Sequence, residues 1–62
     1  MNIEEIMAAI RSLAQSQGYY GRLYNSLRNM QTNDPDKWEK VKNKLEGQHF
    51  SDTLDMVMYF ET

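Results

Sequence analysis

Apolar residues recur with a helical period over residues 1–14. They follow the i, i+3, i+4, i+7 spacing that places side chains on one buried face of a helix. Asn2 is suited to cap the start of this helix, and Glu5 lies three residues further on, as a capping box requires. The pattern predicts a buried face that consists of Ile3, Ile6, Met7, Ile10, Leu13 and Ala14.

The stretch SQGYYGRLY, at residues 16–24, interrupts this pattern with two glycines and two adjacent tyrosines. Core positions counted in heptads from the first turn nevertheless fall on Tyr20, Tyr24 and Leu27, so the phase survives the glycines. This favours a helix that continues through the stretch. Tyr19 falls off the apolar stripe, and we expect it at the surface with Tyr20 inside.

We expect the long first helix to cover about residues 3–30 and to be bent or broken near 16–21. Its apolar stripe rotates by roughly 100° between the two halves, whereas helical drift over three heptads explains only about 60°. A glycine inside a helix costs about 1 kcal/mol relative to alanine. Close approach of another helix at Gly21, or a partner lying over Gly18 and Tyr19, would offset that cost.

A further helix is predicted over residues 35–46. Asp34 is its N-cap, Pro35 its first residue and Gly47 its C-terminal stop. Its narrow apolar stripe consists of Trp38, Val41 and Leu45.

The last predicted helix covers residues 52–60 and is capped by Asp52 or Ser51. Met56 and Phe60 lie beside its expected inner face. That inner face consists of Leu54, Val57 and Met58.

Together these segments predict an all-α fold. We expect a small bundle of three helices, or four if the first is broken, in a single helical domain at residues 1–62. The chain has no secretory signal pattern, and no apolar run approaches the length of a membrane span. A cytoplasmic protein without a membrane partner is therefore expected.

Charge is unevenly placed along a chain whose net charge is −2. Residues 47–62 hold Asp52, Asp55 and Glu61 but no lysine or arginine, whereas residues 35–46 hold four lysines against three acids. Ordinary solvated faces explain this distribution. The alternative is an acidic C-terminal surface that faces a basic partner.

No constellation of residues indicates catalysis. His49, Ser51 and Asp52 are of the types found in catalytic triads, but they are adjacent in a turn, where such residues cap helices. One histidine and no cysteine argue against a zinc site. We therefore expect no enzyme activity, no cofactor and no metal.

A surface for another protein is the more economical expectation, because tyrosine, tryptophan and arginine are favoured at binding hot spots. Trp38 is expected in the core with Val41 and Leu45, and an interface anchor is the alternative. A homodimer is one alternative, and nucleic-acid binding by the lysines with Tyr19 is another. The candidate partner-binding residues are Tyr19, Arg22, Met30, Lys37, Trp38, Lys40 and Lys44, with Met56 and Met58 as adaptable neighbours.

The run LAQSQGYYGRLY, at residues 13–24, resembles the "LA-x-SQG-[aromatic]-YGRL" signature of small uncharacterised helical proteins from phages and conjugative elements of gut-type Firmicutes. The resemblance is strongest over residues 3–30 and extends to the region of Trp38 and the tail at 59–61. It implies an origin on a mobile element. Proteins of such origin often regulate gene expression or block host defences such as CRISPR effectors, so the resemblance implies a regulator or inhibitor of a host complex. A nucleic-acid-associated regulator of element genes is the alternative.

Overall fold

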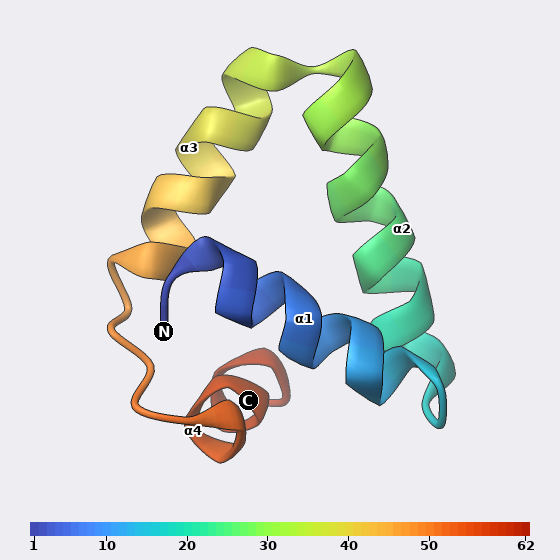
Figure 1. Cartoon of the computed structure of the whole chain (residues 1–62), viewed down its shortest axis with the longest axis vertical. Coiled ribbons are helices and arrows are strands. Elements are labelled where there is room, and N and C mark those ends of the chain that lie inside the picture. The colour runs from blue at the N-terminus through green and yellow to red at the C-terminus, as the bar shows by residue number, and fades with distance from the viewer.

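Four helices and no strand make up the computed structural model, which describes residues 1–62 (Figure 1). They are α1 (Ile3–Ala14), α2 (Gly18–Asn33), α3 (Pro35–Glu46) and α4 (Thr53–Phe60). The expected all-α class is confirmed. In Figure 1, α2 and α3 form the two legs of a letter A, α1 is its crossbar, and α4 lies beneath the crossbar.

The first helical segment is broken, which confirms the alternative of a break near residues 16–21 and corrects the count from three helices to four. The helix ends after Ala14, and Gln17 is extended, with φ −132° and ψ 118°. The apolar phase survives because α1 and α2 pack against each other around one core. The break therefore explains why the apolar stripe rotates by more than helical drift allows. Gly18 is the first residue of α2.

The predicted helix starts are confirmed by their hydrogen bonds. The Glu5 amide donates to Asn2 Oδ1 at 2.9 Å, and the Asn2 amide donates to Glu5 Oε1 at 3.0 Å. Asp34 accepts from the Lys37 amide at 3.3 Å, and Asp52 accepts from the Asp55 amide at 2.9 Å. Each side chain satisfies an amide that has no partner within its helix.

The core draws on all four helices and on the connection between α3 and α4. As expected, Tyr20 is buried and Tyr19 is exposed. Phe50 was not expected in the core, because it lies in the connection rather than on a periodic helix face. The buried residues are Ile6, Ile10, Tyr20, Leu27, Leu45, Phe50 and Met56.

Helix α4 is rotated relative to the prediction: of the predicted inner face, Val57 packs against the core, but Leu54 and Met58 do not. Met56 is fully buried, whereas Leu54 and Met58 are 67% and 59% exposed. Apolar residues surround most of this helix, so their spacing alone does not define an inner face. Aromatic contacts of its last turn set this orientation. The ring centroids of Phe50 and Tyr59 are 5.3 Å apart, and those of Tyr20 and Phe60 are 6.4 Å apart.

Of the expectations about glycines, the one for Gly21 is wrong and the one for Gly47 is confirmed. A Cβ on Gly21 would meet nothing within 4 Å, so no helix approaches closely there. Gly47 ends α3 as predicted, but its φ of −66° is ordinary. The left-handed residue of this connection is His49, with φ 54°.

Candidate protein-binding surfaces

The predicted partner-binding residues do not form one continuous face. Tyr19 and Arg22 lie at the start of α2, and both are exposed. The Tyr19 ring stands edge-on to that of Tyr20, with centroids 5.1 Å apart. Arg22 Nη1 lies 3.7 Å from where a Cβ on Gly18 would be. Arg22 itself therefore covers part of the bare backbone at Gly18.

Met30 and Lys37 lie near the C-terminal end of α2, Met30 on α2 and Lys37 on α3. They line a shallow groove of about 200 Å³ between the end of α2 and the start of α3. Met30 is partly buried against the core, and so is Trp38 on α3. Met56 is fully buried, so it lies on no partner-binding face. The remaining lining residues are Ser26, Asn29, Asn33 and Asp34.

The three predicted lysines of α3 form an exposed stripe. Lys37, Lys40 and Lys44 follow the i, i+3, i+7 spacing of one helix edge, and each is exposed. Their ammonium groups form no ion pair, since the one side-chain ion pair of the chain joins Lys42 to Glu39 at 3.2 Å. The three ammonium groups are therefore free to contact a ligand.

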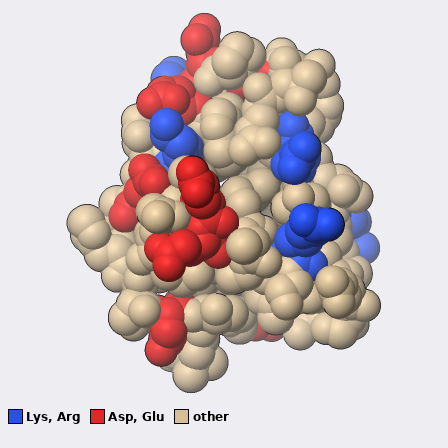
Figure 2. Space-filling view, in the orientation of Figure 1, with Lys and Arg blue, Asp and Glu red and all other residues tan.

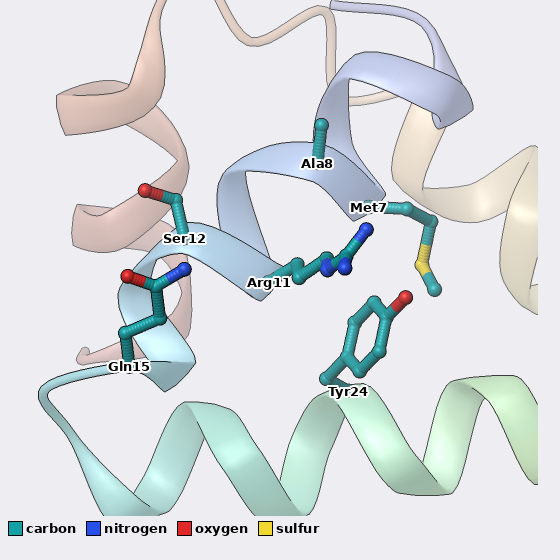
Figure 3. A pocket seen from close by; sticks show the side chains of 6 residues that line it. All are labelled: Met7, Ala8, Arg11, Ser12, Gln15 and Tyr24. Carbon is teal, nitrogen blue, oxygen red and sulfur yellow. The ribbon is translucent and has the colours of Figure 1, made fainter.

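A second groove, of about 400 Å³, lies between α1 and α2 (Figure 3). Figure 3 shows the Arg11 side chain extending along the groove toward the Tyr24 hydroxyl. Arg28 donates to that hydroxyl at 3.2 Å, and its guanidinium carbon lies 5.9 Å from the Tyr24 ring centroid. The groove is lined by Met7, Ala8, Arg11, Ser12, Gln15 and Tyr24. We name this surface, together with the adjoining Arg28, the arginine groove.

The sequence analysis did not single out the arginine groove. One signal was available: residues 6–33 contain three arginines and no aspartate or glutamate. The break between α1 and α2 then decides which arginine of α1 or α2 lies in the groove between these helices. Arg11 lies beside Tyr24, and Arg22 lies elsewhere on α2.

The outward side of α4 is apolar, and the sequence analysis missed it by assigning these residues to the core. Leu54 and Met58 are one turn apart and both are mostly exposed, while Val57 beside them is partly buried. We name these three residues the α4 apolar surface. Asp55 borders it, and Glu61 follows one turn after Met58.

Acidic and basic side chains are unevenly distributed over the face of the molecule shown in Figure 2. In this view, α2 and its border with α1 carry basic groups, acidic groups gather at the start of α1 and over α4, and α3 carries both kinds. Residues 45–62 contain four carboxylates and no lysine or arginine. The α4 apolar surface therefore has an acidic border, and the arginine groove has a basic one.

The residues of catalytic-triad type, His49, Ser51 and Asp52, lie in the α3–α4 connection, where Ser51 and Asp52 form hydrogen bonds at the start of α4. Ser51 donates to Asp55 Oδ2 from its amide at 3.0 Å and from its hydroxyl at 3.3 Å. Asp52 caps α4, and His49 is exposed. No group of three or more histidine, cysteine, aspartate or glutamate side chains is placed to hold a metal ion.

None of the four helices has the length and apolar character needed to cross a membrane. Comparisons with family models, with curated proteins and with solved structures found no match to this chain.

Proposed function

We propose that this chain is a non-catalytic module that binds another protein through the α4 apolar surface. The observation that carries the proposal is the exposure of Leu54 and Met58, at 67% and 59%, on one side of a helix whose opposite side anchors the core. Covering exposed apolar area stabilises a complex by about 25 cal/mol per Å². An amphipathic helix that docks in an apolar groove is a recurrent mode of recognition.

The chemistry of the partner follows from the border of this surface. Asp55 flanks the apolar side chains, and residues 45–62 contain no lysine or arginine. The other nearby carboxylate, that of Glu61, accepts a hydrogen bond from the buried Tyr20 hydroxyl. A partner groove bordered by lysine or arginine would be complementary, and complementary charge chiefly adds specificity and speed of association. Met58 has an unbranched side chain that adapts to the shape of such a groove.

The biological role that we propose is regulation or inhibition of a host complex, such as a defence system. Its support is the resemblance of residues 13–24 to proteins of mobile elements. A small protein that acts by covering a surface of a larger complex needs no catalytic site. The α4 apolar surface supplies a contact of this kind.

Affinity capture with matched variants tests the proposal. The Leu54→Asp, Met58→Asp double variant should keep its helical circular dichroism, because both side chains are exposed. It should lose a partner that the unchanged chain captures from host lysate. The control is Asn25→Asp, Gln31→Asp, which makes the same charge change at exposed positions of α2. Equal capture by the two double variants would contradict the proposal.

The exposed lysine stripe of α3 supports nucleic-acid binding as a second candidate function. Lys37, Lys40 and Lys44 are unpaired and lie on one helix edge. Binding through phosphate contacts weakens steeply with salt. Fluorescence anisotropy with labelled DNA and RNA oligonucleotides should show binding at low salt that the triple lysine-to-glutamine variant lacks. No binding at low salt would exclude this function.

A further inference from the structure

The arginine groove is suited to a ligand that is both apolar and acidic. Met7, Ala8 and the Tyr24 ring supply apolar area. The guanidinium groups of Arg11 and Arg28 supply two positive charges, and neither forms an ion pair within the chain. Guanidinium binds carboxylate through paired, charge-assisted hydrogen bonds, so an unpaired pair of arginines favours an acidic ligand.

Part of this groove is already held in place for binding. The Arg28 guanidinium is fixed against Tyr24 by the hydrogen bond of 3.2 Å and by its position over the ring. A side chain that is ordered before binding loses less conformational freedom when the ligand arrives. Ser12 and Gln15 add neutral polar groups at the edge of the groove.

The chain itself contains a segment of the matching composition, which is α4. We infer that α4 of one copy docks in the arginine groove of a second copy. This inference rests on the proposed function in one respect, because it uses the same α4 apolar surface. Leu54 and Met58 would meet the apolar part of the groove, and Asp55, which borders them, would meet its arginines.

Within one copy, the α4 apolar surface is turned away from the core, so a partner for it would lie outside that copy. α4 packs against α1 of its own chain and buries Met56 completely, so Leu54 and Met58 point away from their own core. Direct contact between two α4 helices is disfavoured, because it would bring carboxylates together with no lysine or arginine of residues 45–62 between them.

Each copy offers one α4 and one groove, so every contact can be made twice across a two-fold axis. Sedimentation velocity over a range of protein concentrations should show a concentration-dependent rise above the monomer mass. Two double variants should lose this rise: Arg11→Glu with Arg28→Glu, and Leu54→Lys with Met58→Lys. For each, we expect self-association at least about tenfold weaker, which corresponds to about 1.4 kcal/mol.

Mixing the two variants is the decisive measurement. The glutamates introduced in one chain then face the lysines introduced in the other, and the untouched surfaces face each other, so association should return. The control variant, Arg22→Glu with Lys40→Glu, makes the same charge change as the groove variant on surfaces outside the groove. It should associate as the unchanged chain does. Circular dichroism verifies that every variant is folded.

Three results would overturn the inference. They are a monomer at every concentration of the unchanged chain, an assembly that the groove variant retains, and a mixture of the two variants that stays monomeric. None of these results touches the proposed function, which depends on loss of a captured partner by the Leu54→Asp, Met58→Asp variant. The two proposals can therefore fail separately.

Discussion

Tyr20 is a fully buried side chain whose polar end reaches the C-terminal tail. Its hydroxyl donates to Glu61 Oε2 at 3.4 Å, and its ring meets those of Tyr19 and Phe60 edge-on. Burial raises the pKa of the Tyr20 phenol above its usual 10.0, and the nearby negative charge of Glu61 raises this pKa further. The folded state therefore favours the neutral phenol.

The pKa of Tyr20 predicts a loss of stability at alkaline pH. Below about pH 10 the phenol is neutral in both states and contributes no pH dependence. Above that pH it ionises in the unfolded chain but stays protonated in the folded one, so the free energy of unfolding falls as pH rises. Urea unfolding at a series of pH values should show a shallower fall for Tyr20→Phe. Parallel curves for the two proteins would contradict the raised pKa.

Gly21 is the position where one substitution should stabilise the fold. It lies inside α2 with negative φ, and an added Cβ would meet nothing within 4 Å. Gly21→Ala should raise the free energy of unfolding by about 1 kcal/mol, because alanine restricts the unfolded backbone and favours helix.

The measurement for Gly21→Ala is the urea midpoint, with Gly18→Ala as the matched control. Gly18 is the first residue of α2, so helix propensity counts for less there. A destabilised Gly21→Ala variant would reveal a contact at Gly21 that the fold does not show.

At the scale of the elements, local chemistry predicted where helices start. The capping box at Asn2, the Asp34-Pro35 pair and the cap at Asp52 depend on neighbouring residues alone, and all three are confirmed. The sequence did not distinguish a break after Ala14 from a continuous helix, because the phase of the apolar residues is the same for one helix and for two helices that share a core.

The orientation of α4 is the second feature that the sequence left open. Apolar residues cover most of this helix, and the aromatic contact between Phe50 and Tyr59 decides which side turns inward. Phe50 lies outside any periodic pattern, so its burial could not be anticipated from helix spacing.

Two methionines of α4 provide a direct test of that orientation. Met56 is fully buried, and Met58, two positions along, is 59% exposed. Met56→Ala should cost about 2–4 kcal/mol through lost packing and a cavity, whereas Met58→Ala should stay within about 0.5 kcal/mol. Thermal unfolding followed by circular dichroism compares them. Equal losses, or a larger loss at Met58, would mean that α4 turns its other side to the core.

For the molecule as a whole, the separation of charge is the feature that links fold to binding. The sequence offered an acidic C-terminal surface as an alternative to ordinary solvated faces, because its carboxylates are close together along the chain. It could not indicate the arginine groove, because Arg11 and Tyr24 come together only when α1 packs against α2. Of the residues predicted to bind a partner, Tyr19, Arg22 and the three lysines are exposed, but they lie on separate surfaces.

This separation predicts that salt acts on assembly and on folding in different ways. The proposed contact between copies joins opposite charges at the surface, and the Debye length falls from about 10 Å at 0.1 M salt to about 3 Å at 1 M. Self-association should therefore weaken as sodium chloride is raised. The fold should respond little, because its one side-chain ion pair, Lys42 with Glu39, is at the surface and such pairs contribute about 0–1 kcal/mol. Sedimentation velocity and thermal unfolding on the same samples measure the two effects. Self-association that strengthens with salt would show that apolar area rather than charge joins the copies, and the arginines would then have no part in selecting the partner.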